Sequence, residues 1–150
     1  MAGILTDKEN DSEQAKVFEK LAVVNSYFSE NNIILNAPRC VYSGKEYYVC
    51  MESQNHNRLF FYVGMKKRVG GWRYLCRYVY WGNGNNLTEI ENLFDNAGKK
   101  IQAKYPKARR GGNKQPYIES TIKDPTNEDF DNFKVEALKL FNETKDIIDF

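Results

Sequence analysis

The chain has 150 residues, of which 41% are hydrophobic, so it is long enough to bury the core of a single domain. Its formal net charge is only +2, no apolar run approaches the roughly 20 residues of a membrane span, and no basic start precedes an apolar stretch. These features argue against secretion and membrane insertion, and we expect a cytoplasmic protein. Its three cysteines are widely spaced, which is typical of buried thiols and not of a disulfide framework or a paired metal-binding motif.

The charges are divided unevenly along the chain. Residues 1–56 carry a net charge of −3, residues 57–114 carry +10, and residues 115–150 carry −5. A basic block between two acidic ends indicates either an anionic partner or charges that pair with each other inside the fold.

An amphipathic helix is predicted over residues 12–31, after a flexible segment at residues 1–11. Asp11 and Gln14 have the spacing of a capping box, and apolar residues then recur at helical spacing. From about residue 39 the period changes to two, with aromatic and β-branched residues enriched between turn residues. This pattern predicts an antiparallel meander of four strands, Arg39–Tyr42, Glu46–Ser53, Arg58–Lys67 and Trp72–Trp81.

A second helix is predicted to begin at Thr88, because Thr88 and Glu91 have capping spacing, and to stop at Pro106. A basic loop over residues 107–114, a fifth strand over residues 117–122 and a third helix from Pro125 follow. The order helix, four strands, helix, strand, helix predicts an α+β fold. We expect a two-layer sandwich in which three helices pack on an antiparallel sheet of four to five strands, in one domain over residues 12–150.

Basic and aromatic residues are interleaved between Lys66 and Trp81. Strand alternation sorts the last strand of the meander into one face with Trp72, Tyr74, Cys76, Tyr78 and Tyr80, and another with Arg73, Leu75, Arg77, Val79 and Trp81. If helices cover one face, the other exposes either a ladder of rings or a pair of arginines. The alternative is that the rings are core and that the arginines pair with acids of the third helix.

A second basic cluster runs from the end of the second helix into the loop that follows, where it could track a phosphate backbone. Alternatively, it is only a solvated helix end and loop. Together the two clusters predict a basic binding surface, whose candidate residues are Lys66, Lys67, Arg68, Trp72, Arg73, Tyr74, Arg77, Lys107, Arg109 and Arg110.

Two other motifs point to no chemistry. Gly82 and Gly84 stand between a strand and a helix, where amides can hold an anion, but the third glycine of a dinucleotide-binding motif is missing. A turn is the better interpretation. His56 is the only histidine, which rules out a multi-histidine metal site, and we expect an exposed turn residue.

Carboxylates remain as candidate metal ligands or acid/base pairs. Glu46 and Glu52 share one predicted strand and Glu119 lies on another, but neither Glu52 nor Glu119 is followed by the lysine of the E-x-K pattern of restriction-type nucleases. We therefore expect no catalytic residue, no cofactor and no metal, and the sequence favours a protein that is not an enzyme.

Two binding roles fit the basic, aromatic-rich surface. In the first, the protein is a nucleic-acid-binding module whose rings stack on bases and whose cations pair with phosphates. In the second, it is a small protein-interaction or inhibitor domain, of the kind that phages and mobile elements use to block a host complex. The same surface then meets an acidic or nucleic-acid-binding protein, since Trp, Tyr and Arg dominate interface energetics. A metal-dependent hydrolase built on the carboxylates is a remote third.

Overall fold

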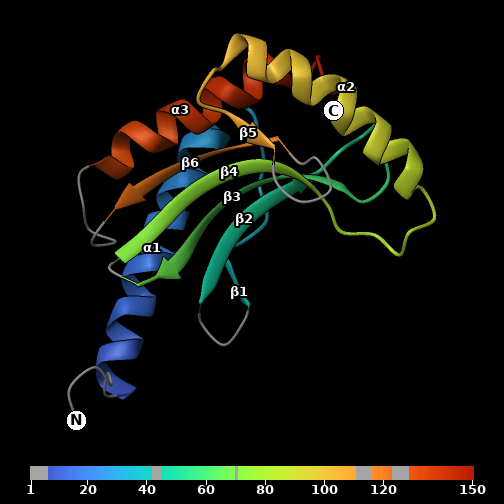
Figure 1. Ribbon diagram of the computed structural model, residues 1–150. Coiled ribbons are helices and arrows are strands. Elements are labelled where there is room, and N and C mark those ends of the chain that lie inside the picture. The colour runs from blue at the N-terminus through green and yellow to red at the C-terminus, as the bar shows by residue number, and fades with distance from the viewer. Residues whose placement is uncertain (1–6, 42–44, 70, 111–115, 123–128) are drawn as a thin grey trace.

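The computed structural model describes residues 7–41, 45–69, 71–110, 116–122 and 129–150 (Figure 1). The side chains of residues 7–12, 41, 110, 116–122 and 129 lie outside that description. In chain order the elements are α1 (Asp7–Glu30), β1 (Arg39–Val41), β2 (Glu46–Glu52), β3 (Leu59–Arg68), β4 (Gly71–Tyr80), α2 (Leu87–Lys104), β5 (Arg109–Arg110), β6 (Pro116–Ile122) and α3 (Asp129–Thr144).

The strands form one six-stranded sheet in the order β1-β2-β3-β4-β6-β5, and every neighbouring pair is antiparallel. The predicted α+β class and the predicted order of elements are confirmed. The four strands of the meander pair in sequence because only a few residues separate each from the next along the chain, and β6 then pairs with β4 after the α2 connection. The two-residue strand β5 was expected to be part of a loop.

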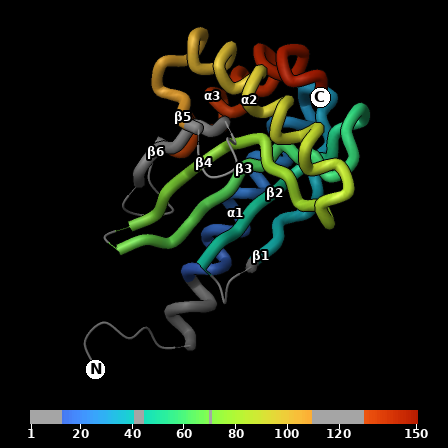
Figure 2. The backbone as a smooth tube through the Cα atoms, turned by 45° about the vertical axis from the view of Figure 1, so that its right-hand side comes forward, coloured from blue at the N-terminus to red at the C-terminus, as the bar shows by residue number. Residues whose placement is uncertain are grey.

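The helices pack against one face of the sheet and build the main core there. Side chains from β2, β3 and β4, among them Val49, Phe61 and Tyr74, form a single buried cluster with Leu21 of α1 and Phe94 of α2. Figures 1 and 2 both show α1 running behind the strands. No helix in the described part of the chain is long and apolar enough to cross a bilayer.

The helix boundaries differ from the sequence expectation at two points. The helix α1 begins at Asp7, so residues 7–11 are helical where a flexible segment was expected, and residues 1–6 lie outside the described residues. No proline or glycine interrupts residues 7–11, and acidic residues in a first turn suit the helix dipole. The N-cap of α2 is Asn86 and not Thr88, and its side chain makes no capping hydrogen bond.

The expected third helix is present, and its rings are buried. The helix α3 begins at Asp129, whereas the expected start at Pro125 lies outside the described residues. Phe133 stacks on Tyr74 of β4, with ring centroids 5.1 Å apart, and Phe141 packs on Phe61 of β3 at 4.8 Å. The acidic helix α3 therefore belongs to the layer on the core side of the sheet.

Candidate nucleic-acid interface

The second face of the sheet, here called the open face, carries its own smaller apolar cluster. That cluster consists of Cys50, Phe60, Tyr62, Leu75 and Val79, with Tyr48 and Trp81 packed against it. The buried hydrophobic residues of the described helices all belong to the other cluster. Among the described elements, therefore, the sheet alone forms this surface.

A buried carboxylate lies near the centre of the open face. Glu46 is 7% exposed, and its Oε1 accepts a hydrogen bond from the Tyr62 hydroxyl at 2.5 Å. Lys66 Nζ lies 3.7 Å from one carboxylate oxygen of Glu46, and a terminal nitrogen of Arg77 lies 3.8 Å from the other. The site thus contains one anion between two cations, so its positive charge is partly compensated.

Burial governs the ionisation of this cluster. Burial, and then the Glu46 carboxylate, raise the pKa of the Tyr62 phenol well above its ordinary value. Burial, and then the neighbouring Arg77 guanidinium, lower the pKa of Lys66, while Glu46 acts in the opposite direction. At neutral pH Tyr62 is therefore a neutral hydrogen-bond donor.

Rings and guanidinium groups cover the rest of the open face. Tyr48 stacks on Tyr62 with centroids 5.3 Å apart, and the Trp81 ring lies 5.3 Å from Tyr48 and 5.1 Å from Phe60. The guanidinium of Arg77 lies over the Tyr62 ring at 4.8 Å. Since Tyr62 and Phe60 are buried, the partly exposed rings of this group are Tyr48 and Trp81.

Arg58 closes one end of the open face in an unusual backbone conformation. Its φ angle is 64°, a left-handed value that is uncommon for a residue other than glycine. Its amide donates to the Glu52 carboxylate at 2.8 Å, and its Nε donates to the Trp81 carbonyl at 2.6 Å. The guanidinium lies over the Phe60 ring at 5.1 Å. These contacts hold a cation beside the partly exposed Trp81.

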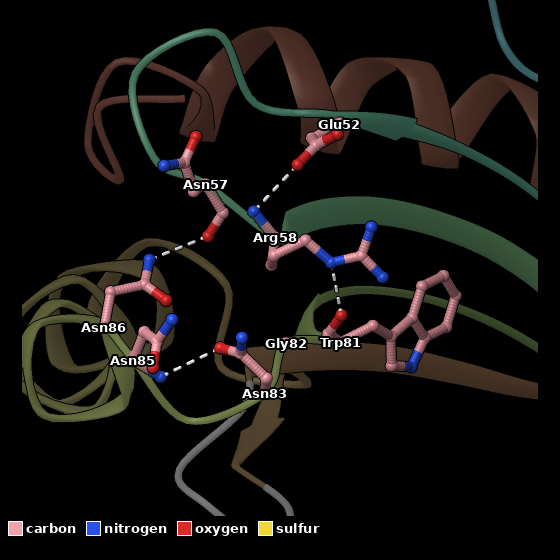
Figure 3. Close-up of a pocket in the computed structure, with 8 residues that line it drawn as sticks. All are labelled: Glu52, Asn57, Arg58, Trp81, Gly82, Asn83, Asn85 and Asn86. Carbon is pink, nitrogen blue, oxygen red and sulfur yellow. Dashed lines mark hydrogen bonds between the residues drawn. The ribbon is translucent and has the colours of Figure 1, made fainter.

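Two cavities meet at Arg58. One, of about 590 Å³, lies on the open face and is lined by Asn36, Arg39, Glu46, Tyr48, Cys50, Glu52, Arg58, Phe60, Arg77 and Trp81. The other, of about 670 Å³, is lined by Glu52, Asn57, Arg58, Trp81, Gly82, Asn83, Asn85 and Asn86 (Figure 3). Glu52, Arg58 and Trp81 line both hollows, so the two adjoin at these residues, and each has the size of a ligand site.

The structure separates the residues predicted between Lys66 and Arg77 into two groups. By strand alternation Lys66, Arg68, Arg73 and Arg77 lie on the open face. Trp72 and Tyr74 lie in the main core, 3% and 0% exposed, and cannot stack on a ligand. Lys67 lies on the core side as well, where its Nζ is 2.7 Å from Glu13 of α1. The same glutamate accepts a hydrogen bond from the Trp72 indole at 3.0 Å.

The predicted loop cluster is also divided. Arg109 is exposed, and the register Arg109↔Tyr117↔Arg77 places it on the same sheet face as Arg77. Arg110 lies on β5, but its side chain is outside the described residues. Lys107 is exposed beside Tyr105, at a hollow that α3 also lines, away from the open face.

His56 lies in the turn between β2 and β3, as expected, but the expectation that it is exposed is wrong, because two carboxylates flank it and it is only partly exposed. Its Nδ1 is 2.8 Å from Glu89 of α2 and its Nε2 is 3.3 Å from Asp149, and its side chain is 13% exposed. The two carboxylates contact opposite ring nitrogens and so do not converge on one point. The described residues contain no group of three or more His, Cys, Asp or Glu that could hold a metal ion.

Sequence reasoning missed Arg58, Tyr48 and the role of Gly64. A Cβ at Gly64 would overlap the Tyr62 ring, which lies across this glycine to reach Glu46. A glycine inside a strand indicates such a close approach, so Gly64 was a signal for the site. Comparison with protein-family models, with curated proteins and with solved structures found no match to this chain.

Proposed function

We propose that the protein is a non-enzymatic nucleic-acid-binding module whose binding surface is the open face of the sheet. The observation that carries this proposal is that cations and partly exposed rings lie together on the face that the described helices leave uncovered. Strand register gathers there the basic residues Arg39, Lys66, Arg68, Arg73, Arg77 and Arg109, with Arg58 at the end of the face.

The charge balance of this face supports a polyanionic ligand. The acidic residues on the same face are Glu46 and Glu52, and the strand register adds Glu119, which pairs with Leu75. Glu46 is already engaged by Lys66 and Arg77, and Glu52 by the Arg58 amide. Arginine forks suit phosphate oxygens, and sheet surfaces with rings are a common way to hold unpaired nucleic acid.

Fluorescence anisotropy with labelled DNA and RNA, single- and double-stranded, tests the proposal when it is titrated from low to physiological salt. We expect binding that weakens linearly in log Kd against log salt, because cations that replace condensed counterions produce that slope. Binding to at least one of the four probes should persist near physiological ionic strength. Absence of binding to all four probes at low salt would contradict the proposal.

An acidic or nucleic-acid-binding protein is the second candidate partner for the same face. The arrangement that favours it is the pair of partly exposed rings, Tyr48 and Trp81, beside Arg58 and Arg77. These residue types dominate the binding energy of protein interfaces, and an inhibitor domain could use them to block a complex. The anisotropy experiment separates the two functions. Binding that persists near physiological salt supports the nucleic-acid role, whereas absence of binding at low salt leaves a protein partner for this face.

A further inference from the structure

The cavity of about 670 Å³ at Arg58 lies beyond the basic strands and has a different lining. Besides Glu52, Arg58, Trp81 and Gly82, it is lined by four asparagines, Asn57, Asn83, Asn85 and Asn86. Figure 3 shows Asn83, Asn85 and Asn86 on one side of the hollow and Arg58 with the Trp81 ring on the other, while the side-chain amide of Asn57 points away from Trp81. A planar group that enters the hollow could contact the ring and the amides of the asparagines on the opposite side.

The amides are available to a ligand to different degrees. Asn86 Nδ2 donates to the backbone carbonyl of Asn57 at 2.8 Å, and Asn83 Oδ1 accepts from the backbone N–H of Asn85 at 3.1 Å. The side chains of Asn83 and Asn86 are therefore partly engaged. The side chains of Asn57 and Asn85 have no hydrogen-bond partner among the described residues, and both residues are exposed. Each carboxamide offers two donors and an acceptor, which matches the mixed donor and acceptor edge of a nucleobase.

Arg58 supplies the third element of the cavity. Of the three guanidinium nitrogens, only Nε makes a hydrogen bond within the described residues, so the two terminal nitrogens can donate to a phosphate. Its left-handed backbone at φ 64° is a conformation that persists when neighbouring contacts enforce it, and such residues cluster at ligand sites. Here Glu52 and the Trp81 carbonyl enforce it.

We infer that this cavity takes one unstacked nucleobase, stacked on Trp81 and read by the Asn85 side-chain amide, with its phosphate on Arg58. The inference rests on the proposed function and specifies its ligand as single-stranded nucleic acid. In a duplex the bases are stacked and their pairing edges are occupied, so no base can enter a pocket of this kind without leaving the helix. A strand that lies along the basic face passes beside the cavity, because Arg58 and Trp81 line both hollows.

Tryptophan fluorescence provides a direct readout, because the chain has only two tryptophans. In a Trp72→Phe background, the emission reports on Trp81 alone. We expect single-stranded oligonucleotides to quench this emission over the same concentrations at which anisotropy shows binding. The same sequence as a blunt duplex should bind more weakly and leave the emission unchanged. Should the Trp72→Phe variant fail to fold, the quench of the unmodified protein is compared with that of Trp81→Phe.

Substitutions then test each wall of the cavity. Trp81→Ala should weaken single-strand binding at least about fivefold, the lower end of what base stacking contributes. Arg58→Gly removes the cation but tolerates the left-handed backbone, and it should also weaken binding. Asn85→Ala should weaken binding as well, whereas Asn142→Ala, which removes an exposed amide from α3, should change nothing.

The outcomes separate the inference from the proposed function. Single-strand binding that leaves Trp81 emission unchanged and tolerates Trp81→Ala would overturn the base pocket while the open face remains the binding surface. Equal affinity for duplex and single strand would also overturn it. Absence of binding to any nucleic acid at low salt would overturn the proposed function itself.

Discussion

Glu46, Tyr62 and Gly64 form one interacting group that positions the cations at the centre of the open face. The Tyr62 ring lies across Gly64 so that its hydroxyl reaches Glu46, and the ring is then covered by Arg77. The carboxylate in turn holds Lys66 and Arg77 near the sheet. Paired charges of this kind restrict the cations to defined positions, so less side-chain entropy is lost when a ligand binds them.

Replacement of Gly64 by alanine tests this interacting group. The new Cβ overlaps the fully buried Tyr62 ring, which must move and lose its bond to Glu46, so we expect a loss of about 1 to 3 kcal/mol of unfolding free energy. Urea denaturation measures it. In a Tyr62→Ala background, the same Gly64→Ala change should cost clearly less, because no ring remains to be displaced. An equal cost in both backgrounds would show that the ring is not what limits this position.

Buried phenols make a prediction about alkaline pH. Burial, the largest cause in each case, raises the pKa of Tyr47 to about 12 and raises the pKa values of Tyr62 and Tyr78 as well. Because these folded-state values lie above those of the unfolded chain, their stabilising contribution is complete below pH about 10 and is lost as the pH rises further.

Tyrosinate absorbance and circular dichroism, followed together from neutral to high pH, check this expectation. At least three of the ten tyrosines should ionise late and together with unfolding. Titration of all ten near pH 10 with a native circular dichroism spectrum would contradict the burial of these three rings.

Among the elements, α3 contributes most clearly to stability through its aromatic face. Phe133 is 2% exposed and stacks on Tyr74, so Phe133→Ala should cost about 3 to 5 kcal/mol of unfolding free energy. Asn132→Ala, at the exposed neighbouring position, should stay within about 0.5 kcal/mol. Urea denaturation of both variants is the measurement, and an equally stable Phe133→Ala variant would show that this ring does not belong to the core.

The elements with a long periodic pattern were predictable from sequence, and the short ones were not. Alternating rings defined β2 to β4 to within one residue at each end, because half-buried strands require that pattern. The strand β5 has two residues, too few to show a period, and so was taken for a loop. The start of α1 was placed too late because Asp11 imitates a capping residue within a helix that already runs from Asp7.

The candidate site could be predicted only in part, because alternation does not say which face the helices cover. Both faces of β4 carry rings, and packing against α1 and α3 buries Trp72 and Tyr74. The contacts that build the cavity at Arg58 join the turn after β2 to the loop after β4, 23 residues apart in sequence. Such contacts follow from the sheet register, which no local pattern encodes.

For the whole molecule, the layers explain the uneven distribution of charge along the chain. The acidic helix α3 lies in the helix layer on the core side, while Arg73, Arg77 and Arg109 lie on the open face. The acidic residues of the described helices therefore lie on the other side of the sheet from these arginines. A sheet face that gathers cations outside the helix layer is what binding to a polyanion requires.

The most direct test of this account removes two charges from each face in turn. Arg73→Ala/Arg109→Ala takes two cations from the open face, and Lys16→Ala/Lys139→Ala takes two exposed cations from the helix layer, so both variants have the same net charge. In the anisotropy assay, the open-face variant should lose affinity for single-stranded nucleic acid and lower its salt slope by about 2, whereas the helix-layer variant should bind like the unmodified protein. Equal losses in both variants would show that binding follows net charge alone and would contradict the assignment of the open face.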